Sequence, residues 1–170
     1  MTSSDNAPTS ANDQGVVVER LLDAPRELVW RTWTECEHFM RWYGPKNMST
    51  HVCEIDFRVG GRHLYGMRSP DGWEYYTTGV YQEIVPIERF VTTDVLSDAE
   101  GNNVPPSHYG MPEDAPAETT VIVTLEEVDG GKTKLAVRQI GWTDESIAQG
   151  AAGGWSEALD KREEVLADIK

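Results

Sequence analysis

Residues 51–67 read HVCEIDFRVGGRHLYGM, and this stretch decides the fold. On both sides of the Gly60–Gly61 pair, apolar and polar residues alternate with a period of two, which is typical of a strand that buries one face. A glycine pair between two such runs predicts a β-hairpin. The middle of the chain is therefore predicted to form an antiparallel sheet.

The register of this hairpin depends on the length of its turn, because a shift of one residue moves every side chain to the opposite face. A two-residue turn would place His63 beside the charged residue Asp56. A three-residue turn, Val59–Gly61, places His63 beside Ile55 and Phe57 and keeps one face apolar. We therefore predict the three-residue turn.

Outward from the hairpin, a β-branched run begins at Val16, and Pro25 suits the first turn of a helix. Near the other end, Trp155, Leu159 and Leu166 recur at helical spacing. No strand–helix alternation follows residue 45, so the strands form a meander, and the last helix is the element left to cover its apolar face. The expected elements beside the hairpin are strands at about 16–22, 74–84, 89–96, 119–127 and 133–140, short helices at about 25–34 and 36–43, and a long helix at about 146–169.

These elements predict an α+β fold in which a curved antiparallel sheet grips a long C-terminal helix, with two short helices after the first strand. The chain has 170 residues, which is room for one domain. We expect a disordered tail at residues 1–14 and a single domain at residues 15–170.

Charge and composition exclude several classes of partner. Fifteen Lys and Arg residues against 29 Asp and Glu residues give a net charge of −14, and nucleic acid binding depends on cationic contacts to phosphates. No apolar run reaches the length of a membrane span. The first residues lack a secretory signal, and Cys36 and Cys53 are too few for a disulfide scaffold, so we expect reduced thiols and a cytoplasmic location.

Several motifs together resemble the family of homologues of the activator of heat-shock-protein-90 ATPase, within the START-like SRPBCC superfamily. The resemblance implies the helix-grip fold, with a cavity between sheet and helix that holds a hydrophobic small molecule. Chaperone activation is not expected to carry over, because the chaperone activators have a separate N-terminal domain and only a short tail precedes Val16. The motifs are APRELVWRTWT (24–34), RWYGP (41–45), EIDFRVGGRH (54–63), PDGWEYYTTGVYQEIVPIERFV (70–91) and GGWSEALDKREEVL (153–166).

The many large rings of the chain are the main functional signal in the residues themselves. Each ring alone suits an ordinary core, but as a set they suit the wall of an apolar pocket with a few polar groups. The predicted ligand-binding cavity comprises Trp33, Trp42, Phe57, His63, Tyr65, Met67, Tyr81, His108, Tyr109, Met111 and Trp155.

Catalysis is left open by the sequence. His63, Tyr65 and Tyr81 are weak candidates for proton transfer in a cyclase- or aromatase-like enzyme that uses the same cavity. A metal site would need His51 and Cys53 on one strand face with His63 across the hairpin. A packed histidine beside a structural thiol explains the same pattern, so we predict neither a metal nor a cofactor.

The connection at residues 97–118 is longer than a hairpin needs, and its centre carries apolar Val104, Tyr109 and Met111. We predict a lid over the cavity, with His108 and Tyr109 offering hydrogen bonds to a ligand. Packing on the outside of the sheet or contact with a second subunit are the alternatives. Residues 90–131 contain no Lys or Arg, which indicates a solvated acidic face or a docking surface for a basic partner.

Two functions follow from these patterns. The first is a small-molecule binding protein, a monomer or homodimer, with a hydrophobic or aromatic ligand inside. The second is a chaperone-interacting module that uses its acidic surface. A hollow interior with convergent polar groups favours the first function, and a filled core favours the second.

Overall fold

The computed structural model describes residues 15–112, 114–143 and 145–169. The tail predicted at residues 1–14 lies outside the described residues. The described chain forms one seven-stranded antiparallel sheet in the order β1-β7-β6-β5-β4-β3-β2. The strands are β1 (Val16–Leu22), β2 (Ser49–Ile55), β3 (Arg62–Arg68), β4 (Glu74–Val85), β5 (Arg89–Ser97), β6 (Glu118–Val128) and β7 (Lys132–Ile140).

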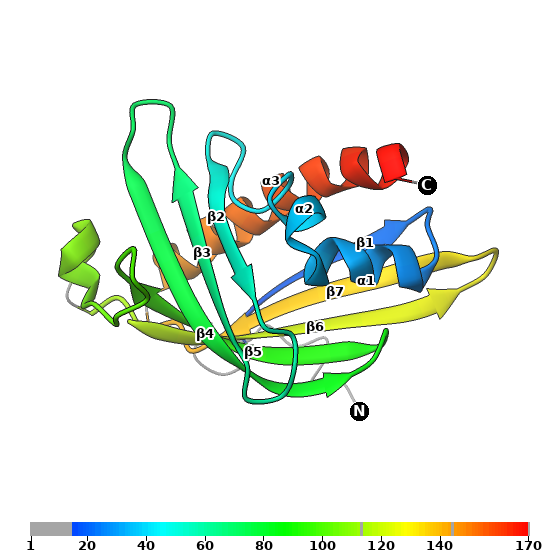
Figure 1. The fold of residues 1–170 in the computed structure, drawn as a ribbon, viewed down its shortest axis with the longest axis horizontal. Helices are drawn as coiled ribbons and strands as arrows, with labels where there is room; N and C mark the ends of the chain where they lie inside the picture. The colour runs from blue at the N-terminus through cyan, green and yellow to red at the C-terminus, as the bar shows by residue number, and fades with distance from the viewer. Residues whose placement is uncertain (1–14, 113, 144, 170) are drawn as a thin grey trace.

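Three α-helices lie on the same side of the curled sheet (Figure 1). They are α1 (Arg26–Thr34), α2 (Cys36–Phe39) and the long α3 (Glu145–Ile169), and a 3-10 helix, η2 (Pro106–Tyr109), lies in the connection between β5 and β6. The α+β class and the helix-grip architecture are confirmed. Of the second short helix predicted at residues 36–43, only the first turn is α-helical.

The period-two alternation of the strands separates an inner face from an outer one. On the inner face, Val123 and Val137 pair across β6 and β7, and both are fully buried against the helices. Rings from α1 and the turn after α2 complete this core, where Trp33 and Trp42 meet at 4.7 Å between ring centroids. The interior of this half is therefore closely filled.

The central hairpin has the predicted face but a longer turn. Ile55 pairs with His63, so the apolar face is preserved as expected. The three-residue turn is wrong, because β2 ends at Ile55 and β3 begins at Arg62. Gly61 returns so close to the chain that a Cβ there would lie 2.0 Å from the Asp56 carbonyl oxygen, which only glycine allows.

A β-bulge between Thr50 and Val52 changes the direction of His51. On one side of the bulge Thr50 pairs with Met67, and on the other Cys53 pairs with Tyr65, so both keep the inner face. The extra residue releases His51 to the outer face, where its ring packs on Tyr76 at 5.8 Å. The prediction that His51 and Cys53 share one face is therefore wrong.

Cys36 and Cys53 form a disulfide, with 5.8 Å between their Cα atoms. The expectation of reduced thiols is therefore wrong. Sequence spacing could not reveal this pair, because the two residues approach only when α2 packs on β2. The bond fastens the short helix, which buries Phe39, to the edge strand of the sheet.

The side chain of Arg162 is the largest charged group in the core, and it is fully buried. Its guanidinium lies over Trp33 at 5.2 Å and over Trp42 at 5.0 Å from the ring centroids. None of its three nitrogens has a hydrogen-bond partner among the described residues. Burial lowers the pKa of Arg162 to about 9, because the interior disfavours the charged form.

Among the described residues, no helix combines the length and the apolar character that crossing a bilayer requires.

Replacing both cysteines by alanine (Cys36→Ala with Cys53→Ala) should lower the free energy of unfolding by about 3 kcal/mol. The disulfide closes a loop with a sequence separation of 17, and its loss restores conformational entropy to the unfolded chain. Denaturant unfolding measures the difference. Treating the double variant with a reductant should change nothing further, and equal stability of the variant and the parent would contradict the bond.

Arg162→Met should raise the free energy of unfolding by roughly 1–3 kcal/mol, because an apolar side chain removes three unpaired donors and a desolvated charge. Arg20→Met is the matched control, since Arg20 is paired with Asp160 at 2.7 Å and Glu163 at 3.1 Å. That variant should lose up to about 1 kcal/mol. A large loss of stability in Arg162→Met would show that contacts with the two tryptophans outweigh desolvation.

Candidate functional site

Two adjoining hollows lie between the inner face of the sheet and the first half of α3. The first has a volume of about 180 Å³ and the second of about 190 Å³. We call them together the cleft, and five residues line both of them: Tyr75, Asp94, Gln139, Trp142 and Ala151. The cleft is thus the unfilled counterpart of the ring-filled half of the interior.

The cleft exists because α3 carries small residues where it crosses this part of the sheet. Gly150, Ala151 and Gly154 line the first hollow. A Cβ at Gly150 would meet no atom within 4 Å, so the space beside it is open. Larger residues at these positions would close the gap between helix and sheet.

The polar groups of the cleft converge on Gln139. Its side-chain oxygen accepts a hydrogen bond of 2.8 Å from Nε1 of Trp155 on α3. Its amide donates to Thr119 Oγ1 at 2.7 Å and to Asp94 Oδ2 at 3.3 Å. Gln139 therefore joins three strands and the helix in one hydrogen-bonded network.

Asp94 is the one charged side chain among the described residues that line the cleft. Its Oδ1 is buried and has no hydrogen-bond partner among these residues. Burial raises the pKa of Asp94 to about 6, and the Thr77 hydroxyl and the Gln139 amide oppose part of this rise. The carboxylate is thus ionised at neutral pH, but with one oxygen unsatisfied.

Two tyrosines border this carboxylate. Tyr43 and Tyr75 line the first hollow together with Asp94. Burial, and next the negative charge of Asp94, raise the pKa of Tyr43 well above its usual value. The same two causes raise the pKa of Tyr75. Both rings are therefore neutral at any ordinary pH and supply apolar faces and hydroxyl groups.

The structure distributes the predicted cavity residues over four places: the cleft, a small recess, the aromatic core and η2. Met67 and Trp155 line the first hollow, and Met111 lines the second. Trp33, His63 and Tyr65 surround a recess of only about 20 Å³ that reaches Asp94 and Trp155. Away from the cleft wall lie Trp42, Phe57 and Tyr81 in the aromatic core and His108 and Tyr109 on η2.

The three candidate proton-transfer residues do come together, but deep below the cleft. His63 stacks on Tyr65 at 4.4 Å, and the hydroxyls of Tyr65 and Tyr81 are 3.5 Å apart. His63 Nε2 donates to the Thr93 carbonyl at 3.1 Å. Burial lowers the pKa of His63 to about 4, so the ring is neutral at physiological pH. A recess of this size has room for a water molecule rather than a ligand.

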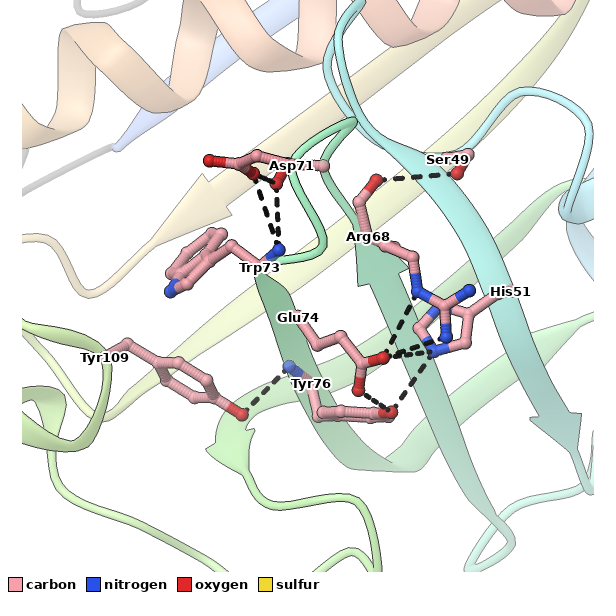
Figure 2. A network of polar contacts seen from close by, with 9 residues as sticks. Ser49, His51, Arg68, Asp71, Trp73, Glu74, Tyr76 and Tyr109 are labelled. Carbon is pink, nitrogen blue, oxygen red and sulfur yellow. Dashed lines mark hydrogen bonds and ion pairs between the residues drawn. The ribbon is translucent and has the colours of Figure 1, made fainter.

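His51 belongs to a polar network with Glu74, Arg68 and Tyr76 (Figure 2). Its Nε2 lies 3.2 Å from the Tyr76 hydroxyl, which donates to Glu74 at 2.8 Å. Glu74 is also paired with Arg68 at 2.8 Å. Since Cys53 is bonded to Cys36, the three ligands considered for a metal site are not brought together.

The connection at residues 97–118 forms part of the cleft wall through Met111 and residues 115–117. Tyr109 fastens it to the sheet, because its hydroxyl donates to the Ser97 carbonyl and accepts a 3.0 Å hydrogen bond from the Tyr76 amide (Figure 2). The Tyr109 ring packs on Tyr75 at 4.8 Å. Its hydroxyl is therefore occupied by the backbone, whereas His108 is exposed.

Sequence reasoning missed Asp94 and Gln139 as site residues, although a signal was present. In β5, Phe90 and Thr92 face inward, and Asp94 occupies the next inward position. Gln139 follows Val137 in the same way on β7. A polar residue that continues an inward-facing apolar series indicates either a structural network or a site.

Asp94→Asn should raise the free energy of unfolding at neutral pH by up to about 3 kcal/mol, and should change it little near pH 4. Because the folded-state pKa is raised to about 6, the folded protein binds more protons than the unfolded chain between about pH 4 and 6, and its stability falls as the pH rises through that window. Asparagine does not titrate, so the difference grows over the same range.

Thermal unfolding across this pH range measures the effect, with the exposed Asp129→Asn as the matched control. If the free energies of unfolding of Asp94→Asn and the parent protein differed by the same amount at pH 4 and at neutral pH, a buried, titrating Asp94 would be contradicted.

Comparisons with known proteins agree with this architecture. Protein CV1439 of Chromobacterium violaceum is 26% identical, with 89% of this chain and 95% of that chain covered at a TM-score of 0.73. Protein NE0264 of Nitrosomonas europaea is 24% identical, with 90% and 94% covered at 0.71. The AHSA1 protein of Silicibacter pomeroyi is 19% identical, with 91% and 99% covered at 0.74.

Comparison with curated protein sequences gives no match. The family model described as "Activator of Hsp90 ATPase homolog 1-like protein" matches residues 23–167. This match covers all strands after β1 and every helix except the last two residues of α3, and the chain belongs to the family of activator of Hsp90 ATPase homolog 1-like proteins.

Proposed function

We propose that the protein binds a small hydrophobic or aromatic molecule in the cleft. The observation that carries the proposal is the open space beside Gly150, in a hollow that Ala151, Gly154, Tyr43 and Tyr75 also line. Most small-molecule sites are concave, apolar and equipped with a few placed polar groups, and this cleft has that form.

The size of the cleft suits a compact ligand. Its two hollows, of about 180 and 190 Å³, meet at Asp94 and Gln139. A flat ring system would lie against Tyr43, Tyr75 and Trp155, while one polar substituent would reach the network of Gln139. The connection at residues 97–118 would close one side of such a ligand, and its role as a lid stays a prediction.

Chaperone interaction is the second candidate function, and the acidic run at residues 90–131 favours it. Glu126 and Glu127 are exposed at the end of β6, where a basic partner has access. A hollow interior is not required for such docking. We therefore rank ligand binding first.

Two earlier expectations lose support from the geometry. A reaction that depends on His63, Tyr65 and Tyr81 would take place where a ligand has no room, so any chemistry in the cleft would draw on Asp94 instead. Reduced thiols were one of the arguments for a cytoplasmic location, and the disulfide between Cys36 and Cys53 removes that argument.

Isothermal titration with 1-naphthylmethanol, a neutral flat probe, tests the proposal. Saturable binding is expected, with thermal stabilisation that follows mass action. Ala151→Phe should weaken the binding by roughly tenfold or more, because the ring would occupy both hollows, a loss of about 1.4 kcal/mol.

Ala167→Phe is the matched control, since Ala167 is exposed on the same helix. It should leave the affinity unchanged. Absence of saturable binding to the parent protein, or equal affinity in the folded Ala151→Phe variant, would contradict the proposed site.

A further inference from the structure

We propose that the ligand of the cleft carries a cationic nitrogen, an amine or related base, that binds the free oxygen of Asp94. The inference rests on the proposed function, because it names the chemical class that the cleft selects. It adds a polar end to a ligand whose bulk is apolar.

The first argument is the unsatisfied oxygen. Asp94 Oδ2 already accepts from Gln139, but the buried Oδ1 has no hydrogen-bond partner among the described residues. The Thr77 hydroxyl lies near enough to lower the pKa of Asp94, but it too has no hydrogen bond of good geometry among these residues. A buried acceptor without a donor is costly, and more so when it is charged. A ligand N–H group placed in the first or second hollow, both of which Asp94 lines, would supply the missing donor once the carboxyl group turns this oxygen towards the hollow.

The second argument is the charge around Asp94. Among the described residues that line the cleft and its recess, none is Lys or Arg. His63 in the recess has a pKa of about 4 and is neutral. The phenols that face Asp94, those of Tyr43, Tyr65 and Tyr75, have raised pKa values and are neutral as well. The negative charge of the carboxylate is therefore uncompensated.

The third argument is the aromatic lining of the cleft. Tyr43, Tyr75, Trp142 and Trp155 line the first hollow with Asp94. Ring faces attract cations as well as apolar groups, which makes an aromatic wall compatible with an organic ammonium ion. The donors that the same walls offer an anion, the tyrosine hydroxyls and the unpartnered Nε1 of Trp142, carry no positive charge. The net charge of −14 would repel an anion before it arrived.

A neutral ligand that accepts a hydrogen bond from protonated Asp94 is the competing explanation for the free oxygen. The two differ in their pH dependence. Because the pKa of Asp94 is about 6, a cation would bind better above that pH, where the carboxylate is ionised, and a neutral acceptor would bind better below it. Of the groups named above, His63 and the three tyrosines do not titrate between about pH 5 and 8, so a pH dependence in this range reports on Asp94.

Three probes of one shape test the inference by isothermal titration: 1-naphthylmethylamine, 1-naphthylmethanol and 1-naphthoate. At about pH 7.5 the amine should bind roughly tenfold more tightly than the alcohol, as expected of a charge-assisted hydrogen bond. The carboxylate should bind more weakly than both. The ratio of the affinity for the amine to the affinity for the alcohol should fall towards one at about pH 5, as Asp94 becomes protonated.

In Asp94→Asn the ratio should fall to about one at every pH. Glu126→Gln removes the same charge at an exposed position outside the cleft and should keep the ratio, which excludes general attraction of cations to an acidic protein. A ratio near one in the parent protein, or a tenfold ratio that survives in Asp94→Asn, would overturn the inference. The alcohol would still bind in that case, whereas failure of all three probes would overturn the proposed function too.

Discussion

One geometric constraint governs this molecule: a strongly curled sheet of seven strands presents one concave face, and a single long helix has to cover most of it. A straight helix touches a curled sheet closely over only part of its length. Along the second half of α3, rings from α1 and from the turn after α2 fill the space between the helix and the sheet. At the first half it is left open, and there the helix carries glycine and alanine. The filled core and the open cleft thus both result from the mismatch in shape between the straight helix and the curled sheet.

The constraint also explains why two uncompensated charges survive inside the protein. Arg162 lies in the filled half, held between the faces of Trp33 and Trp42. Asp94 lies in the open half, with one carboxylate oxygen bound by Gln139. Each charge is stabilised locally, and each has a pKa moved towards its neutral form by burial. The buried cation lies between two ring faces in a closed region, while the buried anion gives the cleft its polarity.

The fold could be predicted from the sequence because it depends on periodicity, which the side chains display directly. The alternation of residues 51–67 gave the correct apolar face, since a wrong register would have exposed Ile55. Features that depend on one extra or one distant residue could not be predicted in this way. The bulge that turns His51 outward adds a single residue to β2, and no pattern of hydrophobicity marks it.

The site was harder to predict than the fold for a related reason. Large rings are conspicuous in a sequence, but a ring fills space as readily as it lines it, and Trp42 and Tyr81 belong to the packed core. What makes the cleft is the absence of side chains at Gly150 and Gly154. Its specificity comes from Asp94 and Gln139, which are ordinary polar residues until the pairing of β5, β6 and β7 turns them inward.

The glycines that create the cleft also weaken the helix that roofs it. Each glycine within a helix costs about 1 kcal/mol relative to alanine, and Gly150, Gly153 and Gly154 fall within two turns. Those turns bury only small side chains, chiefly Ala148 against Val16, whereas Leu159 and Leu166 hold the later turns in the core. Local opening is cheapest where propensity and packing are both low. Low helix propensity and the small size of the buried side chains therefore both make the first half of α3 the part of the helix where local opening costs least.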